Sequence, residues 1–209
     1  MKTTYPRLKT DERLLVQGCR DGDEQAWLSL YRAYGRDVGS FLKGMLRDHA
    51  EVDDLVQRVF LEFLSSIQRF RGESSLRTWL LGIARNLAMN EIRSRGRREK
   101  YVRAYGETIN HTKSSLDDQI HARHQLNHVQ RLLGRLEPDF REVWLLRELN
   151  GCSVAETAIV LGLEEATVRT RHFRARKHLL HLLNIHAKAP PQPKTRTGVP
   201  LQLVQSEDS

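Results

Sequence analysis

Hydrophobic residues recur at helical spacing almost throughout the chain, and no sustained two-residue alternation indicates a sheet. The spacing predicts a short helix from Asp11 to about Cys19. It predicts a longer helix after Asp23, whose side chain is well suited to cap a helix N-terminus. A third helix is expected from about Glu51 to Ile67. Together with the segment that follows, these helices predict an all-α bundle over residues 11–98.

The segment Phe70–Arg98 combines an apolar stripe with a basic flank. The stripe has a helical period and contains Leu76, Leu80, Ile83, Ala84 and Leu87. A Gly- and Ser-containing turn precedes it, as is usual before a helix. At about 100° per residue, one flank beside the stripe carries Trp79, Asn86, Asn90 and Arg93. Arginine neutralises phosphate, asparagine reads base edges and an aromatic ring stacks on an unpaired base, so this flank suits nucleic acid.

These residues taken alone also fit a solvated basic helix with Trp79 in the core. The charge of the whole chain bears on this choice, because the net charge of +8 is unevenly distributed. Residues 71–103 contribute +6 and residues 166–188 another +6, so the remainder sums to −4. Two basic islands indicate a polyanion held at two places. Residues 11–62 carry −4, so we expect that part to contact something other than DNA.

The helical periodicity fades after Arg98, and residues 99–122 are expected to form a flexible linker. A second small helical domain is predicted over residues 123–186. Its first stripe contains Leu126, Val129, Leu133 and Leu136. Pro138 fits the first turn of the next helix. Residues 187–209 hold four of the six prolines and are expected to form a disordered tail.

The second domain carries the pattern of a helix-turn-helix. Ser153 and Glu156 predict a capping box for a short helix, Val154–Leu161, which Gly162 would end. After a tight turn, a last helix is expected over Ala166–Leu183. Its inward face would contain Val168, His172, Ala175 and Leu179.

The rest of this last helix is basic, and Phe173 lies far round from the inward face. An exposed aromatic side chain among arginines suits contact with thymine methyls or sugars. The N-terminal half of a recognition helix lies near the bases in the major groove. The predicted DNA contacts of this helix are Arg169, Thr170, Arg171, Phe173, Arg174, Arg176 and Lys177.

The remaining composition argues against several other classes of protein. Cys19 and Cys152 are the only cysteines, far apart and in no metal spacing, so both are expected to be free thiols in a reducing compartment. No signal peptide and no apolar run of membrane-spanning length is found, which predicts a cytoplasmic protein without membrane insertion. No Gly-rich phosphate loop, nucleophile elbow or paired carboxylate site is present. We therefore expect no enzymatic activity and no cofactor.

Three histidines have a metal-like spacing: His121, His124 and His128 share one face of a predicted helix. No fourth ligand lies nearby in sequence. A metal is conceivable there, but no metal site is predicted.

Three segments, in this order, resemble an extracytoplasmic-function (ECF) sigma factor of the bacterial sigma-70 family. They are EVDDLVQRVFLEFL, FRGESSLRTWLLGIARNLAMNEIRSRGRR and LEPDFREVWLLRELNGCSVAETAIVLGLEEATVRTRHFRARKHL. The resemblance covers roughly residues 11–98 and 123–183. It implies a first domain that binds core RNA polymerase and melts the −10 element. It also implies a second domain that reads the −35 element and sits on the β flap.

The resemblance also implies residue roles. Asp54 and Gln57, with Asp53, would contact the β′ clamp helices of the polymerase. The turn at residues 70–76 would hold a flipped base, and the linker would thread the polymerase near the RNA exit path. The −10 DNA site would comprise Arg71, Ser74, Ser75, Arg77, Trp79, Asn86, Asn90 and Arg93. The seven basic-helix residues named above would bind the −35 major groove. The sequence departs from the family pattern at Arg58, where an acid is common, and at Ala166, where a glycine is common.

The implied function is promoter-specific transcription initiation in a stress or signal response, controlled by an anti-sigma factor. The protein would be cytoplasmic, and nucleoid-associated when bound to polymerase. A second reading is a transcription regulator that binds duplex DNA through the helix-turn-helix while the first domain dimerises or senses. That reading leaves the first basic island unexplained. A histidine-dependent metal hydrolase is a more distant alternative.

Overall fold

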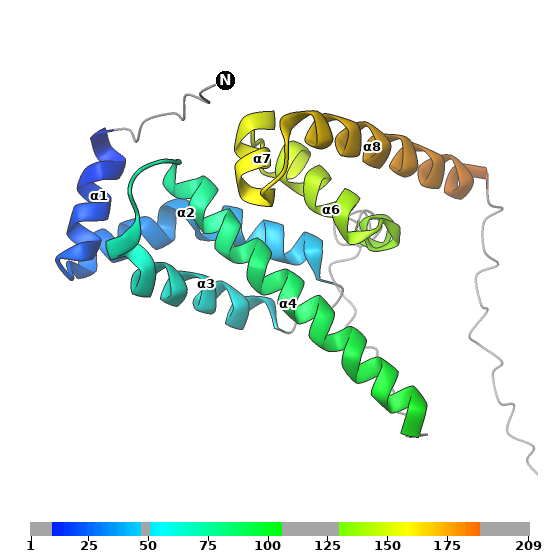
Figure 1. Cartoon of the computed structure of the whole chain (residues 1–209), viewed down its shortest axis with the longest axis horizontal. Helices are drawn as coiled ribbons and strands as arrows, with labels where there is room; N and C mark the ends of the chain where they lie inside the picture. Colours follow the sequence, from blue (N-terminus) through cyan, green and yellow to red (C-terminus); the bar gives the residue numbers. More distant parts are fainter. Residues whose placement is uncertain (1–9, 47–50, 106–129, 189–209) are drawn as a thin grey trace, which may run out of the picture.

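The computed structural model describes residues 10–46, 51–105 and 130–188, which form helices joined by short turns (Figure 1). No strand occurs in these ranges, which confirms the all-α prediction for them. None of the helices described is long and apolar enough to cross a membrane. Nor does this part of the chain contain a His, Cys, Asp and Glu cluster that could hold a metal. The predicted histidine face at His121, His124 and His128 lies outside the described residues.

In residues 10–46 and 51–105 the N-terminal domain consists of four helices and a single 3₁₀ turn. These are α1 (Thr10–Arg20), α2 (Glu24–Met45), α3 (Val52–Ser66), η1 (Ile67–Arg69) and α4 (Leu76–Tyr105). The Asp23 side chain accepts a hydrogen bond from the backbone N–H of Gln25 at 2.9 Å, so the predicted N-cap is confirmed. The apolar faces of α2, α3 and α4 meet around Phe41, Phe60 and Phe63, all fully buried.

α4 extends seven residues beyond position 98, where we expected the linker to begin. The segment from 97 to 105 contains no glycine or proline, and its residues are ordinary helix formers. The side chain of Arg95 also pairs with Glu91 in the same helix and with Glu51, the N-cap residue of α3. Residues 99–105, which we expected in a flexible linker, are therefore helical, and residues 106–122 lie outside the described part.

The described part of the C-terminal domain starts with residues 130–135, which are helical. It continues with α6 (Pro138–Trp144), η2 (Leu145–Leu149), α7 (Val154–Leu161) and α8 (Glu165–Lys188). Pro138 stands in the first turn of α6, as predicted. η2 is a single π-helical turn, in which the Asn150 N–H donates to the Leu145 carbonyl at 2.9 Å.

The helix-turn-helix is present as predicted. The Ser153 side chain and Glu156 form both hydrogen bonds of the capping box. Gly162 ends α7 in the left-handed region with φ 65°, which glycine adopts without steric cost. α8 starts at Glu165 and continues to Lys188, so residues 187 and 188, expected in a disordered tail, are helical. The rest of the predicted tail lies outside the described residues.

The two domains pack against each other, and their buried residues form one continuous hydrophobic core. α2 contacts α6 and η2, and α4 contacts α7 (Figure 1). Arg141 of α6 is 5% exposed. Its guanidinium donates to the carbonyls of Leu133, Gly134 and Leu136 and, across the domain boundary, of Met45 at 2.9 Å. The sequence predicted two domains but no contact between them.

Candidate nucleic-acid and polymerase interfaces

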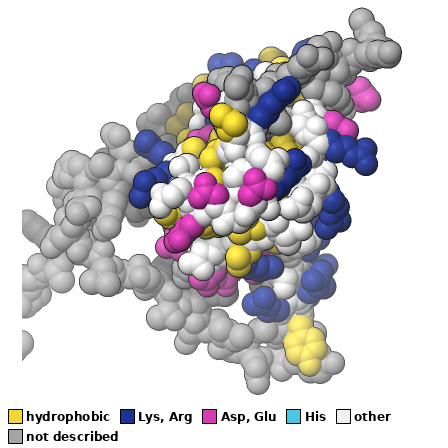
Figure 2. All heavy atoms as spheres, turned by 90° about the vertical axis from the view of Figure 1, so that its left-hand side faces the viewer, with side chains coloured by type: hydrophobic (Ala, Val, Ile, Leu, Met, Phe, Trp, Pro, Cys, Tyr) yellow, Lys and Arg dark blue, Asp and Glu magenta, His cyan; other side chains and the backbone are white. Residues whose placement is uncertain are grey.

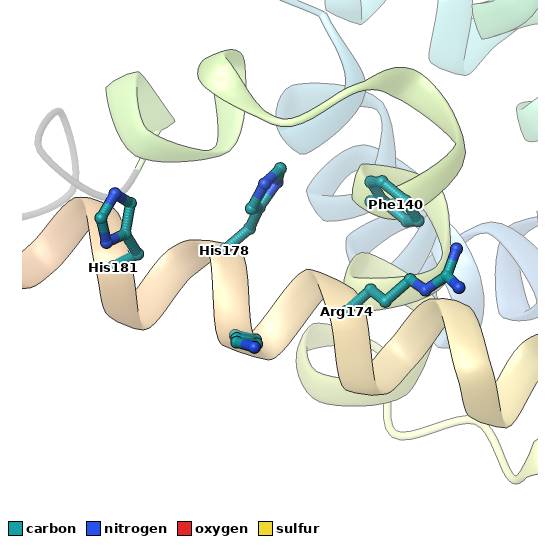
Figure 3. Close-up of a pocket in the computed structure, with 5 residues that line it drawn as sticks. Phe140, Arg174, His178 and His181 are labelled. Carbon is teal, nitrogen blue, oxygen red and sulfur yellow. The ribbon is translucent and has the colours of Figure 1, made fainter.

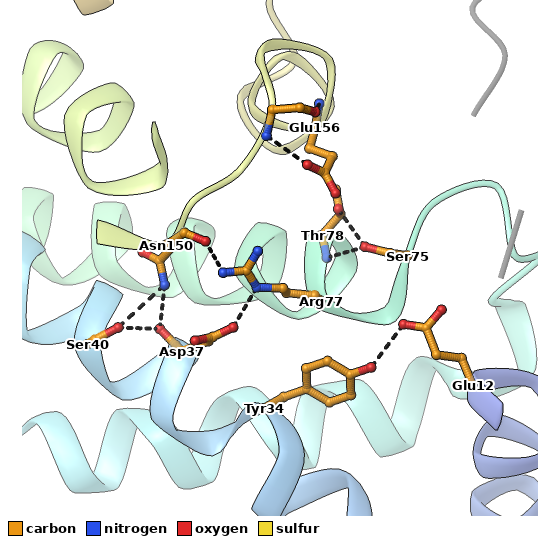
Figure 4. Close-up of polar contacts among 10 residues, drawn as sticks. Glu12, Tyr34, Asp37, Ser40, Ser75, Arg77, Thr78, Asn150 and Glu156 are labelled. Atoms are coloured by element: carbon orange, nitrogen blue, oxygen red, sulfur yellow. Dashed lines mark hydrogen bonds and ion pairs between the residues drawn. The ribbon is translucent and has the colours of Figure 1, made fainter. Parts of the chain in front are cut away.

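The turn before α4 is fixed by its own serines. The Oγ of Ser75 accepts a hydrogen bond from the Thr78 N–H at 3.1 Å and lies 2.8 Å from the Thr78 hydroxyl (Figure 4). Ser74 donates to the Ser75 carbonyl at 3.3 Å. These bonds satisfy the start of the helix, and Arg71 is exposed in the same turn. The turn is therefore held in one shape while its basic side chain faces solvent.

Trp79 packs against Phe70, the residue that precedes this turn. Its ring stacks on Phe70 with centroids 4.5 Å apart and also contacts Phe63 at 5.1 Å. The side chain is partly buried. The predicted flank position is thus a packing position as well.

Further along α4, Asn86, Asn90 and Arg93 are all exposed. Their spacing of four and three residues places them on one flank, so the structure brings these three predicted residues together. Arg95 faces Glu51 and Glu91 instead. Burial disfavours the charge of Arg95, but the hydrogen bonds that its guanidinium donates to those two carboxylates outweigh burial and raise its pKa.

Arg77 differs from the other predicted −10 residues because its guanidinium already binds groups of the same chain. Its Nε pairs with Asp37 of α2 at 2.5 Å, and its Nη2 donates to the carbonyl of Asn150 in the other domain (Figure 4). In this arrangement Arg77 joins the domains and is not free for DNA.

The predicted polymerase-binding residues lie on the outer face of α3. Asp53, Asp54 and Gln57 are exposed, while the opposite face of the same helix is buried against α2 and α4. Asp53 and Asp54 lie in the first turn of α3, where the positive end of the helix dipole stabilises carboxylates. Acidic residues also occur at the turn between α1 and α2, and Figure 2 shows carboxylates gathered on the face of the molecule at its α1 end.

On α8, the predicted inward residues Val168, Ala175 and Leu179 are buried. His172 is only partly buried, and its Nε2 lies 2.8 Å from a carboxylate oxygen of Glu148. Phe173 is 69% exposed, as predicted.

The polar residues of α8 fall into two groups. Those exposed to solvent are Arg169, Thr170, Arg174, Arg176 and Lys177. Arg169 pairs with Glu165 one turn earlier at 2.6 Å, and the Thr170 hydroxyl donates to the Ala166 carbonyl at 3.0 Å. Arg171 is turned toward α6, where its Nη2 lies 2.8 Å from the Asp139 carboxylate.

A shallow hollow of about 360 Å³ lies beside α8, lined by Phe140, Arg174, Lys177, His178 and His181 (Figure 3). The ring centroids of Phe140 in α6 and of His178 are 6.1 Å apart, and the two ring planes are nearly perpendicular. The cationic lining continues the basic surface of the recognition helix.

Three of the polar residues that are buried in the described part of the chain pair across helices and were not predicted from the sequence. Glu142 is 1% exposed, and one of its oxygens accepts a hydrogen bond from Arg85 Nε of α4 at 3.0 Å. Burial raises the pKa of this carboxyl, and the neighbouring Arg85 opposes the rise. Asn150 and Arg141 are the other two. A glutamate and an arginine inside the apolar run of α6 were the available sequence signal.

Two family models match the chain: Sigma-70 region 2 over residues 30–98 and Sigma-70, region 4 over residues 126–179. They correspond to the two structural domains. Region 2 contains the exposed α3 face and the flank of α4, and region 4 contains the helix-turn-helix.

Curated proteins align with both regions. The ECF RNA polymerase sigma factor SigC of Mycobacterium tuberculosis is 37% identical over 168 residues, which cover 79% of this chain and 88% of that protein. The ECF RNA polymerase sigma factor SigX of Bacillus subtilis is 31% identical over 164 residues, covering 75% and 84%.

Solved structures share the arrangement of helices. CnrH in complex with the cytosolic domain of CnrY superposes with a TM-score of 0.66 at 26% identity, covering 85% of this chain and 99% of that chain. The sigma factor RpoE in complex with the anti-sigma factor NepR from Bartonella quintana gives a TM-score of 0.62 at 26% identity, covering 78% and 96%.

Proposed function

The chain belongs to the sigma-70 family and, within it, to the ECF RNA polymerase sigma factors. From this membership we propose a role in transcription initiation for each of its exposed surfaces. A sigma factor of this type is a non-enzymatic initiation factor that directs core polymerase to specific promoters. We propose that α3 binds the polymerase, that α4 and its preceding turn open the −10 element, and that α8 reads the −35 element.

The outer face of α3 is the proposed polymerase contact. Asp53, Asp54 and Gln57 are exposed and project from a helix whose other side is fixed in the core. They offer carboxylates and an amide on a rigid element, which suits the β′ clamp helices as partner. Arg58 on the same exposed face adds a cation, so this contact would accept both signs of charge.

The proposed −10 site is supported by the rigidity of the turn and the exposure of the flank. Extruding a base from a duplex costs a few kcal/mol, and a turn already fixed by Ser75 loses little further freedom on binding. Arg71 at the turn would neutralise phosphate. Asn86, Asn90 and Arg93 would then follow the strand along α4.

The proposed −35 site is the exposed basic face of α8. Arg169, Thr170 and Arg174 lie toward the N-terminal half, the part of a recognition helix that approaches base edges. Arg176 and Lys177 would hold phosphates, and Phe173 would supply an apolar contact. Two DNA sites on one chain give avidity that neither small domain would have alone.

An anti-sigma factor is the proposed regulator. The two solved structures described above are complexes, one with the cytosolic domain of CnrY and the other with the anti-sigma factor NepR. By analogy, a protein inhibitor would cover the surfaces of this chain that meet polymerase until a stress or another signal releases it. The chain would act in the cytoplasm and join the nucleoid with polymerase.

The observation that carries this proposal is the presence of exposed basic surfaces on both α4 and α8, one in each sigma region. The test is transcription in vitro with core polymerase, the purified chain and a pool of bacterial promoter fragments. We expect specific transcripts that depend on the chain. Specific duplex binding without core polymerase, together with no transcripts in its presence, would favour the alternative of a duplex-binding regulator.

A further inference from the structure

Helix α1 is packed firmly on the rest of the N-terminal domain. Cys19, near its C-terminal end, is buried in the core. The hydroxyl of Tyr34 in α2 donates a hydrogen bond to a carboxylate oxygen of Glu12 at 2.9 Å (Figure 4). A Cβ at Gly18 would lie 2.7 Å from the Cβ of Ala26, a distance that real Cβ atoms do not tolerate, so the glycine allows α1 and α2 to approach this closely. The C-terminal end of α1 is therefore held in one position.

The last residue of α1 reaches the start of the loop that precedes α4. The guanidinium of Arg20 donates from Nε to the carbonyl of Ile67 at 3.3 Å and from Nη2 to the carbonyl of Phe70 at 2.6 Å. Ile67 is the first residue of η1, and Phe70 is its C-cap. Figure 1 shows α1 beside this part of the chain, which it contacts. Two N–H groups of one planar side chain thus hold two carbonyls where the loop begins.

The end of α1 leaves the Arg20 side chain available for this contact. The carbonyls of Gln17 and Gly18 accept hydrogen bonds from the backbone N–H groups of Asp21 and Asp23 at 3.0 and 2.9 Å. The carboxylate of Asp21 accepts from the Gln17 side chain at 2.9 Å. Arg20 makes no ion pair with any residue that the structure describes. Its charged donors are therefore directed to the two carbonyls, and such hydrogen bonds are about twice as strong as those between neutral groups.

These hydrogen bonds fix the direction in which the chain enters the loop at residues 71–75. The ring of Phe70 stacks on Trp79, and its carbonyl is held by Arg20. At the other end of the loop, the Ser75 side chain accepts a hydrogen bond from the first turn of α4. Between them, Gly72 has φ 72°, a conformation that glycine adopts without steric cost. The loop is therefore anchored at both ends, and one of its two anchors comes from α1.

We propose that Arg20 is a positioning residue for base capture: by holding the carbonyls of Ile67 and Phe70, it keeps residues 71–75 in the shape that receives the extruded base. The consequence for DNA rests on the proposed function, whereas the effect on the loop is a property of the chain alone. A loop that is ordered before binding loses little conformational freedom when the base enters. Arg20 acts through the loop and not as a DNA contact itself.

The effect on the loop is tested in the free chain by hydrogen–deuterium exchange of a peptide that covers residues 68–80. The backbone amides of Phe70 and Thr78 are both hydrogen-bonded and report on the two ends of the loop. We expect Arg20→Ala to speed exchange in this peptide, because one anchor is lost. Arg13→Ala is the matched control, since it removes the same charge from an exposed position of α1. Unchanged exchange in Arg20→Ala, or equal acceleration in both variants, would overturn the positioning role.

Base selection is measured with the chain bound to core polymerase. The probes are single-stranded −10 oligonucleotides from a promoter found in the transcription test, substituted one base at a time. The position at which the wild type discriminates most strongly reports the captured base. We expect Arg20→Ala to reduce that discrimination about tenfold, the size of one lost base contact. A loss of folded protein would lower the binding of all oligonucleotides in proportion, so their affinity ratio separates positioning from stability. Wild-type discrimination in Arg20→Ala would refute the effect on base capture.

Arg20→Lys and the salt dependence separate positioning from charge. Lysine keeps the positive charge but lacks the planar fork that donates to both carbonyls, so we expect it to recover only part of the discrimination. Full discrimination in Arg20→Lys would show that charge alone is sufficient and would overturn the role of the paired hydrogen bonds. A salt slope reduced by about 0.7 in Arg20→Ala would reveal a direct phosphate contact instead. If the wild type binds no −10 strand although Arg20→Ala loosens the loop, the proposed function fails and the positioning of the loop by Arg20 stands.

Discussion

The ring of Trp79 lies almost parallel to the ring of Phe70, with centroids 4.5 Å apart and planes 12° apart. Phe70 ends the 3₁₀ turn and Trp79 is in the first turn of α4, so the stacked pair bridges the two ends of the intervening loop. That loop is the proposed site for a flipped base. Its shape therefore depends on an aromatic contact that stabilises the domain as well.

Trp79→Ala should lower the free energy of unfolding by about 2–4 kcal/mol, because the stacked ring and its contact with Phe63 are lost. Trp79→Phe keeps a ring in place and should lose clearly less. Urea denaturation measures both. If the ring acts by supporting the loop, Trp79→Phe also retains promoter opening. Unchanged stability in Trp79→Ala would contradict the packing role.

Arg93→Ala should weaken binding to single-stranded −10 DNA and reduce the magnitude of the salt slope by about 0.7, the value of one lost phosphate contact. Arg93 is exposed and has no ion pair in the described part of the chain. Arg98→Ala is the matched control, because it removes the same charge from the other flank, where Arg98 lies 3.9 Å from Glu91. Equal losses of DNA affinity in the two variants would indicate a general effect of charge and would contradict a specific contact on the flank that carries Arg93.

Replacing Asp54 and Gln57 together by alanine should weaken binding to core polymerase while leaving the fold intact, because both side chains are exposed. Co-elution on size-exclusion chromatography with core polymerase measures the loss. Glu62→Ala, at an exposed position two turns along α3, is the control. Co-elution of the double variant at wild-type level would remove α3 as the polymerase contact.

The local features of this fold were predictable because they depend on neighbouring residues. Asp23 caps α2, and Ser153, Glu156 and Gly162 bound α7, as their spacing indicates. The contacts between the domains were not predictable in this way. Arg85 and Glu142 are 57 positions apart, and neither residue type at its own position indicates the other. The inward face of α8 was predicted from periodicity, but the turn of Arg171 toward Asp139 depends on how α6 packs.

Alkylation of Cys152 should be slow in the folded protein. The side chain is 1% exposed, and burial raises the pKa of its thiol to about 11. At pH 8 roughly one thiol in a thousand is then the reactive thiolate. Iodoacetamide followed by mass spectrometry should label Cys152 rapidly only after denaturation. Rapid labelling of the native protein would contradict the buried environment.

The same pKa shift predicts a stability loss in alkaline solution. The unfolded thiol ionises near pH 9.0 and the folded one near 11, so the thiolate favours the unfolded chain. Stability should fall as the pH rises from 9 to 11, by up to about 2–3 kcal/mol from this group. Cys152→Ala removes the contribution, so its stability should fall less over this range. Parallel pH profiles for the two proteins would refute the assignment.

Arg174 and Arg171 lie one turn apart on α8 and should respond differently to substitution. Arg174 is exposed, so Arg174→Ala should weaken −35 binding and reduce the salt slope by about 0.9. Arg171 pairs with Asp139 and lies near the buried Glu142, so Arg171→Ala should lower the thermal unfolding temperature. Binding is measured on −35 duplexes at several salt concentrations, and unfolding by circular dichroism. If Arg171→Ala instead relaxes base preference at full stability, this arginine leaves Asp139 when DNA binds, and its predicted role as a base contact stands.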